Sequence, residues 1–123
     1  MTVETMKVLI CDDSMLARKK IKTALSQIGV TQVFEASDGE QAIAVFKDKR
    51  PDITLMDIVM PKIDGVEALK AILAEDPKAK VVMASSVGTQ ENLKEAIKAG
   101  AFDFLQKPVS EDQIKSLISK TVK

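Results

Sequence analysis

The sequence predicts an α/β domain in which one open sheet of five parallel strands carries helices on both faces. Short apolar runs rich in β-branched residues alternate along the whole chain with longer segments of helical spacing. Strict alternation of this kind, with short right-handed connections, gives a parallel sheet covered on both faces. The chain has 123 residues, 46% of them apolar, which suffices for one core, so we expect one domain over residues 1–123.

Five short apolar runs are the expected strands, each compatible with burial in a parallel sheet. They are residues 7–11, 31–35, 52–56, 80–84 and 102–106. The segments between them have helical periodicity, with charged residues on the opposite face. Two examples of the apolar face are Ala17, Ile21, Leu25 and Ile28 in the first helix, and Leu93, Ala96, Ile97 and Gly100 in the fourth.

Helix-boundary signals agree with this division of the chain. Two residue pairs have the spacing of a capping box, and two glycines stand where helices are expected to stop. Pro77 ends the third helix after Asp76. The capping pairs are Asp38 with Gln41 and Ser110 with Gln113, and the glycines are Gly29 and Gly100.

The composition excludes several classes of function. Lys plus Arg and Asp plus Glu both total 18, so no overall field favours nucleic acid or an anionic membrane as a partner. The first apolar run, residues 8–11, is too short for a membrane span or a signal peptide. Cys11 is the only cysteine, which excludes an internal disulfide and fits a reducing compartment, so we expect a cytoplasmic protein. Without any histidine, a bound metal must be held by oxygen.

Polar residues terminate four of the five expected strands. In an open parallel sheet, sites form beyond the carboxyl ends of the strands, so these residues are expected to meet at one edge. Taken singly, each of these polar residues has an ordinary structural explanation, as a helix cap, a loop residue or a solvated lysine. Their joint placement after four different strands is not expected by chance. They are Asp12 and Asp13 after the first strand, Asp57 after the third, Ser85 and Ser86 after the fourth, and Lys107 after the fifth.

This set of side chains indicates a magnesium site beside a reactive carboxylate. Asp12, Asp13 and Asp57 would repel one another unless a cation lay among them, and Mg²⁺ prefers a few carboxylates together with water and phosphate oxygens. An aspartate oxygen can attack phosphorus to give an acyl phosphate when the phosphoryl oxygens are neutralised. Lys107 and the Ser85 hydroxyl are suited to that task.

These motifs resemble the signature of receiver domains of bacterial two-component response regulators, of the CheY-like single-domain type. The resemblance spans the whole chain and implies the flavodoxin-like strand order 2-1-3-4-5 with five helices. No effector domain is expected after Lys123. The residues that carry the resemblance are Asp12-Asp13, Asp57 before Met60-Pro61, Ser85, and Lys107-Pro108.

The resemblance implies a role for each site residue. Asp57 would be the phosphoacceptor, and Mg²⁺, with Mn²⁺ as an alternative, would be bound by Asp13, Asp57 and the Val59 carbonyl, while Asp12 would act mainly through water. Ser85 and Lys107 would take the places of the family's switch hydroxyl and its lysine, with a cis peptide bond between Lys107 and Pro108. Phe104 would be the rotating switch aromatic, without a hydroxyl.

The function implied is a phosphorylation-activated signalling switch, not an enzyme acting on other molecules. A histidine kinase or phosphotransfer protein would be the donor, and the fourth helix, fifth strand and fifth helix would contact a downstream target. The segments 83–86 and 100–104 resemble chemotaxis receivers more than receivers that precede DNA-binding domains. This resemblance makes a flagellar motor switch one candidate target, with a phosphorelay intermediate as the alternative. The unphosphorylated chain is expected to be a monomer.

Two positions near the site carry apolar residues, Val59 two residues after Asp57 and Val87 two residues after Ser85. Neither side chain can hydrogen-bond an attacking water, so we expect slow self-dephosphorylation.

Two rival classes share parts of this pattern. A haloacid-dehalogenase-type phosphotransferase also uses an aspartyl phosphate, but it requires Asp-x-Asp at the first strand, where this chain has adjacent Asp12 and Asp13. A flavodoxin-type flavin carrier requires a hydroxyl-rich phosphate loop and aromatic side chains, and this chain has neither Trp nor Tyr. Identifying which aspartate is phosphorylated distinguishes the receiver from the phosphotransferase. A colourless purified protein excludes the flavin carrier.

Overall fold

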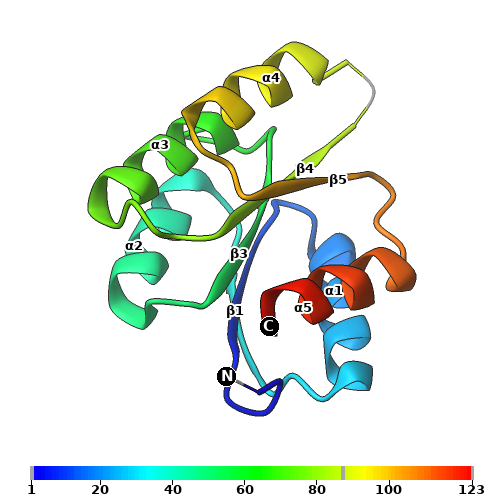
Figure 1. The fold of residues 1–123 in the computed structure, drawn as a ribbon. Coiled ribbons are helices and arrows are strands. Elements are labelled where there is room, and N and C mark those ends of the chain that lie inside the picture. Colours follow the sequence, from blue (N-terminus) through cyan, green and yellow to red (C-terminus); the bar gives the residue numbers. More distant parts are fainter. Residues whose placement is uncertain (1, 87, 123) are drawn as a thin grey trace.

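The computed structural model describes residues 2–86 and 88–122 as a parallel five-stranded sheet of order β2-β1-β3-β4-β5 with five helices (Figure 1). Strands and helices alternate without exception along the described chain, which confirms the predicted fold class and strand order. The elements are β1 (Lys7–Cys11), α1 (Met15–Ile28), β2 (Gln32–Ala36), α2 (Gly39–Lys49), β3 (Ile53–Asp57), α3 (Gly65–Glu75), β4 (Val81–Ser85), α4 (Gln90–Ala99), β5 (Asp103–Gln106) and α5 (Glu111–Val122).

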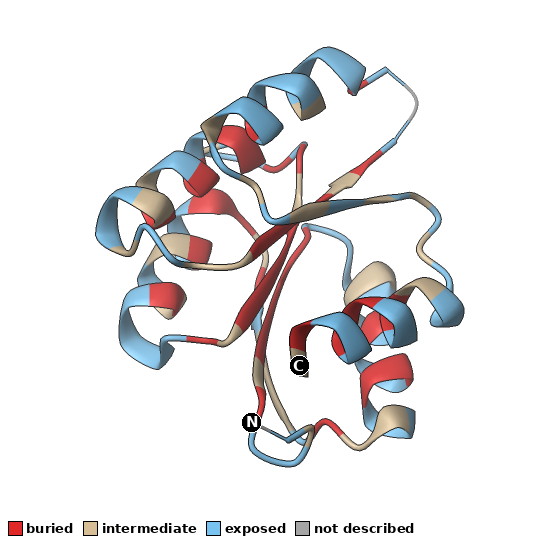
Figure 2. Ribbon diagram, in the orientation of Figure 1, coloured by how far each residue is buried: buried red, intermediate tan, exposed pale blue. Residues whose placement is uncertain are grey.

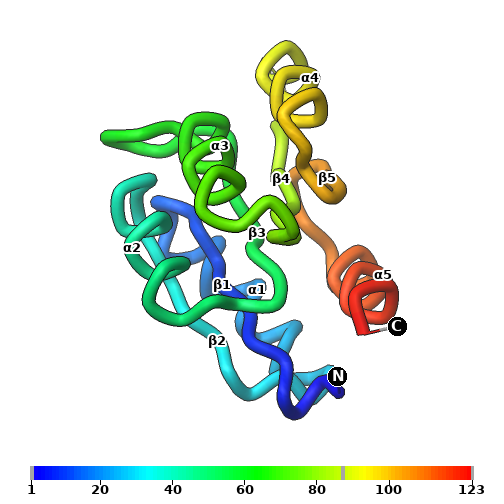
Figure 3. Tube along the Cα trace, turned by 60° about the vertical axis from the view of Figure 1, so that its left-hand side comes forward, coloured from blue at the N-terminus to red at the C-terminus, as the bar shows by residue number. Residues whose placement is uncertain are grey.

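Helices cover both faces of the sheet. Helices α1 and α5 lie together on one face, and α2, α3 and α4 line the other (Figures 1 and 3). Each face therefore has its own apolar core, because side chains alternate along every strand. Ile10 and Leu55 belong to the core beneath α1 and α5, whereas Leu9 and Met56 belong to the core beneath α2 to α4.

The three inner strands β1, β3 and β4 are the most deeply buried elements (Figure 2). In β1 the residues from Val8 to Cys11 are all buried, and β3 is buried until its last residue. The edge strands β2 and β5 are only partly buried, so the prediction of five buried strands was wrong for these two. Each edge strand has a neighbour on one side only, and the covering helices do not reach its outer side.

Three predicted strands begin and end one residue too early: the runs 31–35, 52–56 and 80–84 are observed as Gln32–Ala36, Ile53–Asp57 and Val81–Ser85. Asp57 and Ser85 are the last residues of β3 and β4, not the first residues after them. Backbone pairing continues to Asp57 opposite Ala84 and to Ser85 opposite Gln106, because a polar side chain does not interrupt a backbone ladder. The fifth strand begins at Asp103 instead of Phe102.

The helix ends follow the predicted caps. The Asp38 side chain accepts from the Gln41 amide at 2.8 Å. Ser110 and Gln113 accept from each other's amides at 3.1 and 2.9 Å, a reciprocal capping box. Gly29 ends α1 in the left-handed region with φ 109°, a conformation that side chains disfavour.

The fourth helix differs from its predicted pattern, because Ala96 is its only buried residue and Ile97 is 49% exposed. None of the helices in the described part of the chain has the length and apolar character needed to cross a membrane.

Candidate functional site

The three acidic residues predicted to form the site lie together at the carboxyl edge of the sheet. Strands β1 and β3 are neighbours with Cys11 opposite Met56, so the next residue of each, Asp12 and Asp57, lies at the same level. One carboxylate oxygen from each of Asp12, Asp13 and Asp57 lies within 4.8 Å of the others. The register of the two central strands thus brings these carboxylates together.

Lys107 joins this cluster from the loop that follows β5. Its ammonium donates to Asp12 Oδ2 at 2.8 Å and to Asp57 Oδ2 at 3.0 Å. The side chains of Asp12 and Asp57 are 4% and 12% exposed. The Lys107 amide donates to the Ser85 carbonyl at 2.7 Å, which continues the pairing of β4 beyond β5. The Lys107–Pro108 bond is cis, as the resemblance predicted.

The backbone around the two buried carboxylates holds them in place. The Ser14 amide donates to Asp12 Oδ1 at 2.9 Å, and the Val59 amide donates to Asp57 Oδ1 at 3.4 Å. Arg18, one turn into α1, donates to the Asp12 carbonyl at 2.6 Å. Arg18 was not among the predicted site residues. The only signal for it was a basic residue six positions after Asp12, on a helix expected to begin beside the site.

The electrostatics of the cluster leave an excess of negative charge. Burial raises the pKa of the Asp57 carboxyl, and the nearby Asp12 charge adds to the rise, while the hydrogen bond from Lys107 opposes it. Burial alone would lower the pKa of Lys107, but its hydrogen bonds to Asp12 and Asp57 outweigh that effect and the pKa is raised. One ammonium therefore faces three carboxylates. An all-oxygen donor set with surplus negative charge fits a hard divalent cation such as Mg²⁺.

Asp13 is the exposed member of the cluster. Asp13 is exposed to solvent, whereas Asp12 is buried. Lys107 contacts both Asp12 and Asp57. The cluster thus combines two acids that Lys107 bridges with a third acid that is exposed.

The remaining predicted residues surround this cluster without joining its hydrogen bonds. Ser85 is buried, but it follows Ala84, the partner of Asp57, and so alternates to the other face of the sheet. Phe104 lies on edge strand β5 and is 47% exposed, and Val59 is also exposed. Their expected roles stay predictions. Val87 lies outside the described residues.

The fold and this site define a doubly wound α/β domain with an acidic, lysine-bridged centre at the carboxyl edge of its sheet. The family model of the response regulator receiver domain matches residues 8–119. The chain belongs to the response regulator receiver family.

Relatives in this family match the chain over nearly its whole length. The chemotaxis protein CheY of Listeria monocytogenes is 42% identical over 118 residues, which cover 96% of this chain and 99% of the relative. CheY of Bacillus subtilis is 41% identical over 116 residues, with 94% and 97% covered. A chain in the crystal structure of the CheX–CheY–BeF₃–Mg²⁺ complex from Borrelia burgdorferi superimposes with a TM-score of 0.88 at 31% identity, with 96% and 90% covered.

Proposed function

We propose that this receiver is a phosphorylation-activated switch in which Asp57 accepts a phosphoryl group from a histidine kinase or phosphotransfer protein. The observation that carries the proposal is the convergence of Asp12, Asp57 and Lys107, from the ends of three strands, through hydrogen bonds of 2.8 and 3.0 Å. The chain would catalyse only its own phosphorylation and dephosphorylation. The chemotaxis proteins among its relatives favour a chemotaxis-like role, with a phosphorelay intermediate as the alternative.

The chemistry follows from what each side chain can do. An Asp57 oxygen attacks the phosphorus of the donor, and the bond between phosphorus and the donor breaks. Lys107, already beside Asp57, would turn its ammonium to a phosphoryl oxygen and neutralise negative charge there, in place of the carboxylate charge that Asp57 loses on phosphorylation. Asp13, Asp57 and the Val59 carbonyl would bind Mg²⁺ directly and Asp12 through water, and the bound ion would neutralise further phosphoryl charge.

The output surface would be formed by α4, β5 and α5. Phe104 and Ile97 on this side are 47% and 49% exposed, and Phe102 beside them is 39% exposed. Exposed apolar side chains on neighbouring elements are typical of a protein contact surface. We infer that Ser85 and Phe104 carry the signal from Asp57 to this surface and on to a target protein, for which a flagellar motor switch is one candidate.

The proposal is tested by incubating the protein with acetyl phosphate and Mg²⁺ and measuring its mass. We expect one added phosphoryl group that is lost in Asp57→Asn and absent when the metal is chelated. Peptide mapping after reductive trapping then identifies the labelled residue. A label on Asp12 or Asp13 would instead support a haloacid-dehalogenase-type reaction, and no label on any aspartate would refute the switch.

A further inference from the structure

A cavity of about 610 Å³ opens beside Asp57 and extends along α1 toward the core of that face. Asp12, Asp57 and Lys107 lie at its polar end, and the rest of the lining is largely apolar. Its volume falls in the range of small-molecule sites, which is about 300–1,000 Å³. The lining includes Leu16, Ala17, Ile21, Leu55, Ala84 and Val109.

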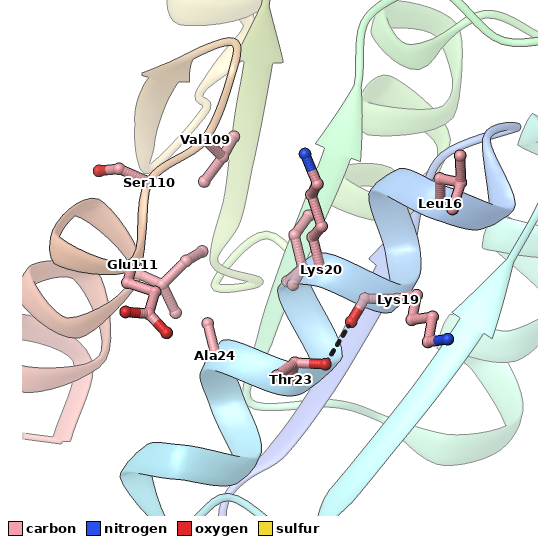
Figure 4. A pocket seen from close by; sticks show the side chains of 10 residues that line it. Leu16, Lys19, Lys20, Thr23, Ala24, Val109, Ser110 and Glu111 are labelled. Atoms are coloured by element: carbon pink, nitrogen blue, oxygen red, sulfur yellow. Dashed lines mark hydrogen bonds between the residues drawn. The ribbon is translucent and has the colours of Figure 1, made fainter.

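Small side chains leave this space open. Ala17 on α1 and Val109 after the cis proline line it, and Ile21 and Leu55, which are almost fully buried, lie deeper. A second groove, shown in Figure 4, continues between α1 and the start of α5 and shares Leu16, Lys20 and Val109 with the cavity. In that view Lys20 extends between Val109 and Leu16. An apolar space therefore borders the reacting carboxylate, with a lysine at its mouth.

We propose that the cavity binds the acyl group of a phosphoryl donor, and that the chain takes phosphoryl groups from acyl phosphates with bulky apolar acyl groups in preference to acetyl phosphate. The inference rests on the proposed function of Asp57. Charge complementarity selects this occupant, since Lys107 and a bound cation suit a phosphoryl group while the apolar walls suit a hydrocarbon group. A wholly apolar ligand would leave the polar end unused.

The transfer balances without a further reactant. An Asp57 carboxylate oxygen forms a bond to phosphorus, and the bond between phosphorus and the acyl oxygen breaks. The electron pair of that bond leaves with the acyl group as a carboxylate anion, and no proton has to move. The cavity contributes by binding the hydrocarbon part of the donor. Burying about half of a phenyl ring corresponds to a preference of about tenfold for the aromatic donor over acetyl phosphate.

The experiment compares the rate constants for labelling of Asp57 by benzoyl phosphate and by acetyl phosphate, and reports their ratio. Benzoyl phosphate supplies the apolar ring, and intrinsic differences in donor reactivity cancel when ratios are compared between variants. Ala17→Met and Val109→Phe fill the cavity from two sides. Ala44→Met makes the first of these changes on the exposed face of α2, away from the cavity, and serves as the matched control.

A second readout does not depend on transfer. Methyl shifts of Leu16 and Val109 are followed by NMR during titration with benzylphosphonate, which cannot donate its phosphoryl group, with methylphosphonate as the control ligand. We expect saturable shifts with benzylphosphonate at concentrations where methylphosphonate gives none. Ala17→Met is expected to abolish the Leu16 shifts.

The inference is supported if the ratio falls about tenfold in both filled variants and is retained in Ala44→Met. An unchanged ratio in Ala17→Met and Val109→Phe, with both variants still folded by circular dichroism, would overturn it. Equal binding of the two phosphonates would overturn it as well. If acetyl phosphate leaves no label on the unmodified chain, the proposed function fails and this inference fails with it, whereas labelling with an unchanged ratio refutes the cavity's role alone.

Discussion

Removing one charge from the acidic cluster, by Asp13→Asn, should change the stability of the protein in opposite directions with and without Mg²⁺. In the absence of a divalent cation, Asp13 adds a third negative charge to two carboxylates that Lys107 already bridges. Asparagine keeps the shape and removes the repulsion. In the presence of Mg²⁺ the same substitution removes a ligand, so the stabilisation by the bound ion is lost.

The magnitudes follow from the distances. Two charges within 4.8 Å of each other interact by at least about 2–3 kcal/mol at effective dielectric constants of about 20–40. Exposure of Asp13 and screening by salt reduce this, so we expect Asp13→Asn to raise the free energy of unfolding by about 1 kcal/mol in EDTA. Mg²⁺ at a hundred times its Kd should stabilise the unmodified chain by about 2.7 kcal/mol. Asp13→Asn should gain less than about 1 kcal/mol from the ion, which makes it the less stable protein in Mg²⁺.

Urea unfolding followed by circular dichroism measures both effects, and the absence of Trp and Tyr rules out the usual fluorescence probe. Asp48→Asn is the matched control, because Asp48 lies on α2 with its side chain 73% exposed. It should shift the free energy by less than about 0.5 kcal/mol in either buffer. If Asp13→Asn shifted stability equally in EDTA and in Mg²⁺, the electrostatic account of the cluster would be wrong.

Three further outcomes follow from single contacts. Thr54 on β3 is fully buried and its hydroxyl has no partner among the described residues, so Thr54→Val should raise stability by about 1 kcal/mol in urea unfolding, and a loss would contradict this. A methyl group on Gly65 would lie 2.1 Å from the Asp57 carbonyl oxygen, so Gly65→Ala should cost about 2–3 kcal/mol and slow labelling by acetyl phosphate, whereas unchanged labelling would show that the Asp57 backbone had not moved. The hydrogen bond from Lys120 lowers the pKa of Asp103. A group whose pKa is lowered in the folded state stabilises the protein above its ordinary pKa, and this stabilisation is lost as the pH falls through the folded-state pKa. The small thermal destabilisation of Lys120→Met at pH 7 should therefore shrink as the pH is lowered below the ordinary carboxyl pKa.

The order and type of the elements could be predicted because each apolar run was short and most helices had a local start or stop signal. Gly29 and Pro77 end helices through local backbone constraints, which act whatever the rest of the chain packs against them. The ends of β3 and β4 could not be predicted from side-chain polarity. Their last residues, Asp57 and Ser85, have polar side chains, but their backbones still pair with the neighbouring strands. The exposure of Ile97 depends on how closely α4 covers the sheet, and helical periodicity does not determine that.

The site was predictable to the extent that strand order determines it. Asp12 follows β1 and Asp57 ends the adjacent strand β3, so any chain with this strand order brings them together. Lys107 follows β5 and reaches them from the loop after it. The Lys107 hydrogen bonds and the Arg18 contact to the Asp12 carbonyl depend on side-chain conformations that no spacing encodes. The cavity was not foreseen either, since it arises from the small size of Ala17 and Val109 at places brought together only in three dimensions.

Lys107 links the chemistry of Asp57 to the rest of the domain because its side chain and its backbone are held by different elements. The ammonium bridges Asp12 and Asp57, while its amide is bound to the Ser85 carbonyl of β4. The proposed phosphorylation would remove the negative charge of the Asp57 oxygen that accepts from Lys107 and place new charge on the phosphoryl oxygens, so the ammonium would have to shift its bonds. Since Lys107 directly follows β5, that shift acts at the end of the strand that carries exposed Phe104. We therefore expect Lys107→Arg, which keeps the charge but changes its geometry, to retain labelling by acetyl phosphate while weakening the response of the α4–β5–α5 surface.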